Sequence, residues 1–165
     1  GWSVDGPTPC LVYALMEGGA LEDRLARRGS WPPLQSSERV VILSDVARGL
    51  AYLHITLQCV HRDVKSANVL LDRGCIGRIG DFGIACKMPT AAHGTSHSTG
   101  SMHGTFVYLS PEAKLGETST KQDSFAYGVL GLEVLTRLPV LTLTHAHTLT
   151  LTLTLTSRRS PSPSP

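Results

Sequence analysis

The 165 residues suffice for one domain with a hydrophobic core, and 41% of them are apolar. A net charge of +2 gives no strong attraction to nucleic acid or to an anionic membrane, so neither is expected as a partner. The four cysteines, Cys10, Cys59, Cys75 and Cys86, form no C-x-x-C pair, which argues against zinc and favours isolated buried thiols in a reducing compartment. There is no basic-then-apolar leader and no run of about 20 apolar residues. We therefore expect a cytoplasmic protein without a membrane span.

The first half of the chain contains three apolar segments. Cys10–Met16 is apolar, which predicts a buried strand that ends before Gly18. Residues 20–26 predict a short helix with Leu21 and Leu25 on one face. From Ser37 to His54 apolar residues recur at three-and-four spacing, which predicts an amphipathic helix capped by Ser36 or Ser37. We expect its buried face to contain Val40, Leu43, Val46, Ala47, Leu50, Ala51 and His54.

The second half combines short strands, a polar loop and an apolar helix. Residues 69–71 and 76–79 predict two strands joined by a turn at Asp72-Arg73-Gly74. Residues 89–104 are rich in Ser, Thr, Gly and His and predict a loop, whereas residues 125–135 predict a helix that is buried on all sides. From residue 140 the sequence changes to alternating Leu and Thr, followed by Ser-Pro repeats. We therefore expect a domain over residues 1–139 and a disordered low-complexity tail over residues 140–165.

One ordered set of polar residues carries a chemical signal. The sequence HRDVKSAN at residues 61–68 is followed by DFG at residues 81–83. Taken singly, Asp63 and Lys65 are an ordinary solvated ion pair, DFG is a turn, and His61 is a core histidine. Eight fixed residue types in this order arise by chance on the order of once in ten billion. The set resembles the catalytic loop and the metal-binding motif of protein kinases.

The resemblance assigns a role to each of these side chains. Phosphoryl transfer needs a carboxylate that orients the attacking hydroxyl, cations that absorb charge, and oxygen ligands for Mg²⁺. Asp63 is expected to accept the proton of the substrate hydroxyl, and Lys65 to point toward the transferred phosphate. Asn68 and Asp81 are expected to face one another across the phosphates and to bind the metal. The implied cofactors are ATP and Mg²⁺.

Two further segments are similar to the same family. Gly104-Thr105 with SPE at residues 110–112 resembles the end of a kinase activation segment. Residues 121–129 resemble the start of the central helix, where Asp123 is implied to bind the backbone of the catalytic loop. The implied fold class is α+β and protein-kinase-like. It comprises mostly the helical C-lobe, with the N-lobe largely absent and the C-lobe truncated after the central helix.

The subfamily resemblance suggests a nucleotide site. CLVYALMEGGALEDRL at residues 10–25 is similar to the strand, hinge and following helix of interleukin-1-receptor-associated and Pelle-like kinases. VHRDVKSANVLLD at residues 60–72 resembles these kinases and the plant receptor-like kinases. On this resemblance Tyr13 is the gatekeeper, the backbone of Ala14 and Met16 binds the adenine edge, and Leu70 packs beneath the ring.

The same resemblance implies substrate class and regulation. Lys65 and Thr105 are typical of serine/threonine kinases rather than tyrosine kinases. Arg62 beside Asp63 implies control by phosphorylation of the activation loop, because an arginine fork holds a phosphate. The candidate acceptors are Thr95, Ser96, Ser98, Thr99 and Ser101.

The sequence lacks two features of the kinase nucleotide site. It has no glycine-rich phosphate loop before the catalytic loop, and its first lysine is Lys65, so the lysine that clamps the α- and β-phosphates is missing. Charge-assisted contacts contribute about 1.5–3 kcal/mol each, so their loss is expected to remove most activity from this chain.

Three hypotheses remain. The leading one is a fragment of an ATP- and Mg²⁺-dependent serine/threonine kinase that acts on protein substrates in intracellular signalling, with an upstream receptor or adaptor complex. The alternative is a non-catalytic kinase-like scaffold that binds signalling partners. A small-molecule phosphotransferase is disfavoured because such an enzyme is not expected to carry Thr105 followed by SPE at residues 110–112.

Overall fold

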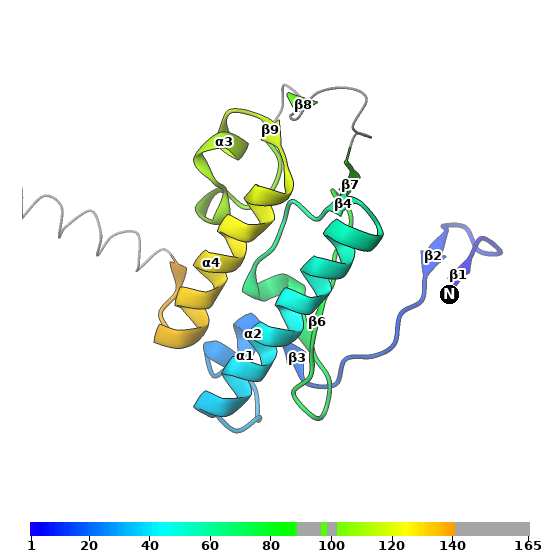
Figure 1. Cartoon of the computed structure of the whole chain (residues 1–165). Coiled ribbons are helices and arrows are strands. Elements are labelled where there is room, and N and C mark those ends of the chain that lie inside the picture. The colour runs from blue at the N-terminus through cyan, green and yellow to red at the C-terminus, as the bar shows by residue number, and fades with distance from the viewer. Residues whose placement is uncertain (89–96, 99–101, 141–165) are drawn as a thin grey trace, which may run out of the picture.

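Two long helices, α2 (Ser36–Ala51) and α4 (Thr120–Thr136), lie side by side at the centre of the molecule (Figure 1). This computed structural model describes residues 1–88, 97–98 and 102–140. The other helical segments are short: α1 (Leu21–Leu25), α3 (Pro111–Lys114), a π-helical turn at Tyr52–Thr56, and 3-10 turns at Ser66–Asn68 and Phe106–Tyr108. The strands are β1 (Trp2–Ser3), β2 (Cys10–Leu11), β3 (Gly19–Ala20), β4 (Cys59–Val60), β5 (Val69–Leu71), β6 (Gly77–Ile79), β7 (Cys86–Lys87), β8 (His97–Ser98) and β9 (Glu117–Thr118).

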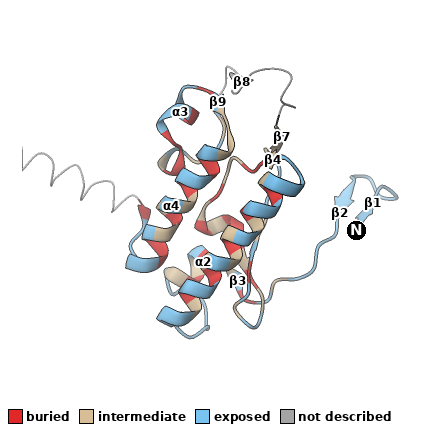
Figure 2. Ribbon diagram, in the orientation of Figure 1, coloured by how far each residue is buried: buried red, intermediate tan, exposed pale blue. Residues whose placement is uncertain are grey.

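The core lies between the facing sides of α2 and α4 (Figure 2). Its central side chains, Ile42 and Val46 from α2 and Leu130 and Val134 from α4, are all 0% exposed. At one end the Arg39 guanidinium donates from Nη1 to the carbonyls of Val134 and Leu135, at 3.2 and 3.1 Å. These carbonyls lie in the last turn of α4, where helical hydrogen-bond partners run out, so Arg39 both satisfies them and joins the two helices.

A three-stranded antiparallel sheet in the order β3-β5-β6 packs against α2, chiefly through β6. The turn between β5 and β6 is closed by Asp72, whose Oδ1 accepts the N–H groups of Gly74 and Ile76 at 2.8 and 2.9 Å. The predicted strand pair and its turn are confirmed, although the second strand begins at Gly77. The structure also confirms the predicted short helix, as α1.

The helix predicted from Ser37 is present, but its cap and its buried face differ from the prediction. Gln35 is the N-cap, and Glu38 Oε2 accepts the Gln35 backbone N–H at 2.7 Å in a capping box. Val40 is 59% exposed, and the buried face contains Arg39 and Ile42 instead. Residues 40–43 are all apolar, so a set of apolar residues at three-and-four spacing can be drawn through more than one face of the helix. The face that contains Ile42 is the buried one, because it packs against α4 and β6.

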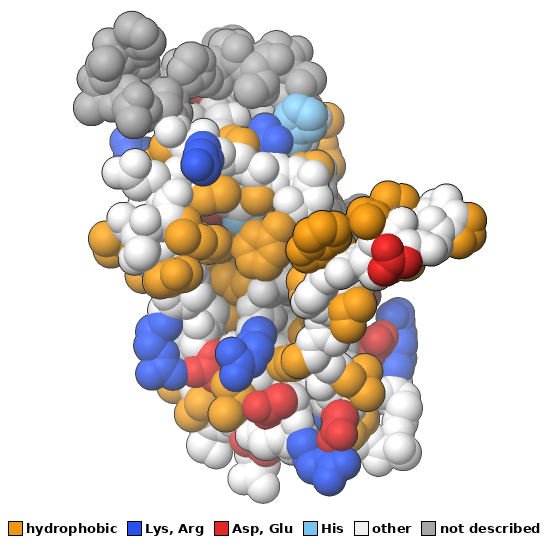
Figure 3. All heavy atoms as spheres, turned by 90° about the vertical axis from the view of Figure 1, so that its right-hand side faces the viewer, with side chains coloured by type: hydrophobic (Ala, Val, Ile, Leu, Met, Phe, Trp, Pro, Cys, Tyr) orange, Lys and Arg blue, Asp and Glu red, His pale blue; other side chains and the backbone are white. Residues whose placement is uncertain are grey.

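The buried strand predicted over Cys10–Met16 is wrong. Only Cys10–Leu11 is a strand, and it pairs with Trp2–Ser3 in a hairpin that projects from the body (Figure 1). Hydrophobic side chains line this projection (Figure 3), and Leu15 is 85% exposed. Within the described residues no other element covers either side of it. An apolar run becomes a core strand only where another apolar surface faces it.

The prediction that the central helix is buried on all sides is also wrong. Phe125, Leu132 and Leu135 are 43, 51 and 59% exposed and follow one side of α4. The described residues provide a neighbour on the side that faces α2 and on the side of the catalytic loop. The apolar residues of the third side therefore remain exposed.

Some predictions fall on residues outside the described part of the chain. Within the loop expected over residues 89–104, His97–Ser98 forms β8 and pairs with β9. Thr95, Ser96, Thr99 and Ser101 lie outside the described residues, as does the expected tail from residue 141.

Candidate active site

The turn that follows β4 is held by one buried carboxylate. Arg62 has a φ of 70°, in the left-handed region that costs a non-glycine residue roughly 1–2 kcal/mol. Asp123, in the first turn of α4 and 1% exposed, accepts the backbone N–H groups of His61 and Arg62 at 2.8 and 2.9 Å. The predicted contact of Asp123 with this loop is confirmed. It compensates the unfavourable backbone by accepting one buried and one partly buried amide.

His54 completes this anchor and was missed as a functional residue. Its Nε2 lies 2.8 Å from Asp123 Oδ2, so the ring donates to the carboxylate. His54 belongs to the π-helical turn that extends α2, a widened turn of a kind often found at functional sites. The sequence spacing indicated only a buried helix face, because a partner 69 residues away leaves no periodic signal.

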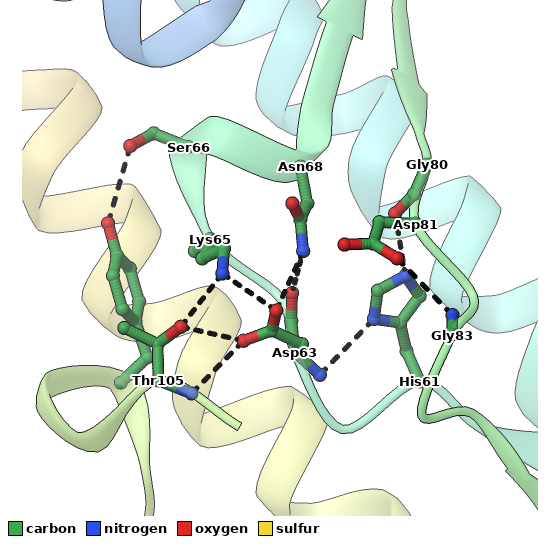
Figure 4. A network of polar contacts seen from close by, with 10 residues as sticks. His61, Asp63, Lys65, Ser66, Asn68, Gly80, Asp81, Gly83 and Thr105 are labelled. Carbon is green, nitrogen blue, oxygen red and sulfur yellow. Dashed lines mark hydrogen bonds and ion pairs between the residues drawn. The ribbon is translucent and has the colours of Figure 1, made fainter. Parts of the chain in front are cut away.

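Asp63 lies at the centre of a polar network (Figure 4). Its Oδ1 accepts hydrogen bonds from the Thr105 backbone N–H and hydroxyl, at 3.0 and 2.8 Å. Its Oδ2 accepts Asn68 Nδ2 at 3.0 Å and pairs with Lys65 Nζ at 2.7 Å. Burial alone would raise the pKa of Asp63, but hydrogen bonds from Lys65, Thr105 and Asn68 outweigh it and lower the pKa. Asp63 is therefore an ionised carboxylate at neutral pH, with both oxygens held in place.

Thr105 and Gly104 connect this network to the segment before α3. Lys65 Nζ donates to Thr105 Oγ1 at 2.9 Å, and Thr105 donates in turn to Asp63. Gly104 has a φ of 104°, and a Cβ at this position would lie 2.4 Å from the Arg62 carbonyl oxygen. Only glycine therefore allows Thr105 to approach Asp63 so closely.

His61 links Asp63 to the DFG segment. Its Nδ1 accepts the Asp63 N–H at 3.2 Å, so Nε2 carries the proton and donates to the Gly80 carbonyl at 3.0 Å. The His61 ring also contacts Phe82 edge-on, with ring centroids 5.0 Å apart. Asp81 follows Gly80 directly with a φ of 59°, and its Oδ1 accepts the Gly83 N–H at 3.3 Å. The two ring nitrogens of His61 thus join the backbone at Asp63 to the backbone just before Asp81. The two predicted acidic residues lie at the same site (Figure 4).

A cavity of about 630 Å³ adjoins this site. Its size lies within the range of small-molecule sites, and its lining is mostly apolar. Ala14, Met16, Leu70 and Asp81, which the sequence analysis assigns to nucleotide or metal binding, line this cavity, whereas Asn68 lies outside the lining. Tyr13 also lines it but is 74% exposed, so the expected gatekeeper does not close the back of the cavity.

The two predicted metal ligands offer hard oxygen donors. Asn68 Nδ2 donates to both the carbonyl and the carboxylate of Asp63, at 2.8 and 3.0 Å, which orients the amide and turns its oxygen away from Asp63. Asp81 supplies an exposed carboxylate. Among the described residues no three His, Cys, Asp or Glu side chains group as a metal site. One carboxylate and one amide fit Mg²⁺, which commonly completes its shell with water and substrate phosphates.

Comparison with known proteins agrees with this geometry. The sequence profile of the protein kinase domain matches residues 3–159. The chain belongs to the protein kinase domain family. The matched region includes both polar motifs, the π-helical turn and the two central helices.

Several plant proteins are similar to this kinase chain. It is 44% identical over 128 residues to LysM domain receptor-like kinase 10 of Oryza sativa subsp. japonica, covering 76% of this chain and 21% of that protein. It is 37% identical over 149 residues to probable serine/threonine-protein kinase PBL23 of Arabidopsis thaliana, covering 87% of this chain and 38% of that protein. U-box domain-containing protein 35 of Arabidopsis thaliana is 38% identical over 140 residues, with 81% and 17% covered. The chain therefore spans well under half of these relatives.

The segment after Thr105 shows how this kinase chain departs from the usual APE motif. Ser110 replaces the alanine and caps α3, because its Oγ accepts the Ala113 N–H at 3.2 Å.

Nearby, Tyr108 Oη donates to Glu133 Oε2 at 2.5 Å and lies 3.3 Å from Ser66 Oγ. No helix of the described residues is long and apolar enough to cross a bilayer.

Proposed function

We propose that this chain forms the catalytic part of a cytoplasmic kinase that phosphorylates serine or threonine in protein substrates, using ATP and Mg²⁺. The single observation that carries the proposal is the set of contacts at Asp63. Each of its oxygens is held by named donors, at 2.7 to 3.0 Å. A carboxylate fixed in this way, with a lysine beside it, is suited to orient a hydroxyl for phosphoryl transfer.

Asp63 and Lys65 take complementary roles. The lowered pKa of Asp63 keeps it ionised, so it orients the substrate hydroxyl and accepts its proton. Lys65 Nζ lies 2.7 Å from Asp63 Oδ2 and provides a positive charge next to the acceptor. Thr105 Oγ1 bonds both the Lys65 ammonium and the Asp63 carboxylate, so it fixes their positions relative to each other.

The nucleotide is proposed to occupy the 630 Å³ cavity. We propose that Leu70 and Met16 contact the base and that Asp81 and Asn68 hold Mg²⁺ at the phosphate end. When bound, ATP would supply the phosphoryl group and Mg²⁺ would neutralise its negative charge. The names of relatives such as LysM domain receptor-like kinase 10 support a further proposal, that the complete protein acts with an upstream receptor or adaptor.

Calorimetry tests the nucleotide site in this chain. We expect Mg·ATP to give a saturable heat that is lost in Asp81→Asn. Of the two proposed metal ligands, Asp81 is charged and Asn68 is neutral, so this substitution removes the negative charge that holds the metal. Asp5→Asn, at an exposed aspartate of the N-terminal hairpin, should bind as the wild type does. The absence of heat with the wild-type chain would overturn nucleotide binding.

Transfer is tested with Asp63→Asn in the longest natural product that contains these residues. Phosphate incorporation from labelled ATP into a serine/threonine peptide library should fall by about 10²-fold or more, while the Mg·ATP heat remains. Unchanged turnover would refute the role of Asp63. Incorporation into tyrosine alone would refute the proposed substrate class.

A non-catalytic scaffold is the second candidate, and one observation favours it. Among the residues that the structure describes, the cavity lining contains no lysine, and Arg78 is its only cation. A nucleotide whose phosphates lack a clamping lysine is bound more weakly. Partner binding without any Mg·ATP heat would support the scaffold.

A further inference from the structure

Arg24 is a buried cation that has no carboxylate partner among the described residues. It lies in α1 and is 5% exposed, and its Nε and Nη1 have no hydrogen-bond acceptor among the described residues. The nearest acidic residues of the same helix, Glu22 and Asp23, face Arg28 instead, at 3.9 and 3.2 Å. Burying a guanidinium without a counter-charge costs free energy, so this position favours any group that brings negative charge.

One neighbour of Arg24 is able to supply that charge. Its Nη2 donates to the Pro32 carbonyl at 3.4 Å and contacts Cys75 Sγ at 3.7 Å, and its guanidinium carbon lies 5.1 Å above the Trp31 ring. A carbonyl and an indole ring do not ionise, whereas a thiol does. Cys75 lies in the turn between β5 and β6 and is partly exposed.

The four cysteines occupy different environments. All four are free, and none is fully buried as the sequence had suggested. Cys10 is exposed, and its Sγ donates to the Thr8 carbonyl at 3.4 Å. Burial raises the pKa of the Cys59 thiol, and Cys86 and Asp123 raise it further. Among the described contacts, only the sulfur of Cys75 receives a hydrogen bond from a buried arginine.

We propose that Cys75 is a site of oxidation by hydroperoxides, with Arg24 stabilising the oxidised sulfur. The thiolate attacks the terminal peroxide oxygen, an S–O bond forms as the O–O bond breaks, and the departing hydroxide or alkoxide takes a proton. Sulfur loses two electrons and the peroxide gains two. The new oxygen lies one bond from a sulfur that already contacts Arg24 Nη2, and it offers the guanidinium a further acceptor.

The experiment compares the four thiols within one protein. The reduced full chain is treated with hydrogen peroxide and a dimedone probe that traps sulfenic acids, and labelling of each cysteine is followed by peptide mass spectrometry. We expect Cys75 to be labelled at least about threefold faster than Cys10, although Cys10 is more exposed, because Arg24 stabilises the oxygen that forms on the Cys75 sulfur. Equal or faster labelling of Cys10 would overturn the proposal.

Variants of two nearby arginines test the cause. Arg24→Met should bring Cys75 labelling down to or below that of Cys10, and Arg24→Lys should retain part of the difference because a cation remains. Arg28→Met is the matched control, since Arg28 is exposed and contacts only Glu22 and Asp23 among the described residues. Circular dichroism reports whether each variant is folded, and Cys59 labelling reports local opening. Unchanged Cys75 labelling in a folded Arg24→Met chain would refute the role of Arg24.

Discussion

The catalytic loop and the N-terminal segment differ in how their residues are held. In the loop at residues 61–68 the motif residues have partners from distant parts of the chain, as Asp63 has in Thr105 and the His61 amide has in Asp123. In residues 1–15 the hydrogen bonds are made within the segment, and all the large side chains are exposed.

The difference shows that an apolar sequence and a buried segment are separate properties. Leu11, Val12 and Leu15 are as hydrophobic as core residues, yet they are 69, 59 and 85% exposed. The loop contains charged residues, yet His61 is 0% exposed, because its amide and both ring nitrogens have partners. Partners elsewhere in the chain decide the outcome in both regions.

The largest expected effect comes from removing the carboxylate that anchors the loop. In Asp123→Ala one buried and one partly buried backbone amide and His54 lose their acceptor, and each such group costs about 1–3 kcal/mol. We expect the free energy of unfolding to fall by roughly 4 kcal/mol in urea titrations. The control is Asp5→Ala in the N-terminal segment, which should change it by less than about 0.5 kcal/mol. Similar losses in the two variants would erase the contrast between the regions.

A pair of leucines tests the same contrast for apolar side chains. Leu71 in β5 is 0% exposed and Leu15 is 85% exposed. Leu71→Ala should lower the free energy of unfolding by about 3 kcal/mol because it leaves a cavity, and Leu15→Ala should leave it within about 0.5 kcal/mol. Both values come from urea titrations. A large loss in Leu15→Ala would mean that the projecting segment packs against the body in solution.

The sequence allowed good prediction wherever local chemistry decides the structure. The turn at Asp72 and the strand pair around it were predicted correctly, because an aspartate that caps a turn needs only neighbouring amides. The family and the gathering of Asp63, Lys65 and Asn68 followed from an ordered motif. The exposed segment at residues 10–16, the face of α2 and the role of His54 were not predictable, since each depends on what lies opposite in space. The catalytic and ligand-binding roles of the site residues stay predictions.

Glu133 is the member of the polar region that is expected to destabilise the fold when ionised. Burial raises its pKa, although the hydrogen bond from Tyr108 partly opposes the rise. A raised folded-state pKa means that the folded protein binds the proton more tightly than the unfolded chain does. Stability therefore falls as pH increases from about 4.3 through the folded value.

Glu133→Gln keeps an acceptor for Tyr108 without a charge. We expect a gain of about 1 kcal/mol in the free energy of unfolding near pH 7 and little change near pH 4. Urea titrations at the two pH values measure it. Glu117→Gln, at an exposed glutamate, is the control. A loss of stability near pH 7 would show that the ionised carboxylate is favourable in this network.

Asp63 should make stability depend on pH in the opposite direction to Glu133, and its effect should be the smallest of those predicted here. Its lowered pKa means that the unfolded chain binds the proton more readily, so its contribution is complete above the unfolded value of about 3.9. That contribution disappears as pH falls through the folded value. In Asp63→Asn the decline in the urea midpoint between about pH 5 and pH 3 should be shallower than in the wild type, whereas Asp5→Asn should follow the wild type. Parallel curves for Asp63→Asn and the wild type would mean that Lys65, Thr105 and Asn68 do not favour the ionised carboxylate. The charged acceptor proposed for phosphoryl transfer would then lose its physical basis, even if all three side chains lie where the structure places them.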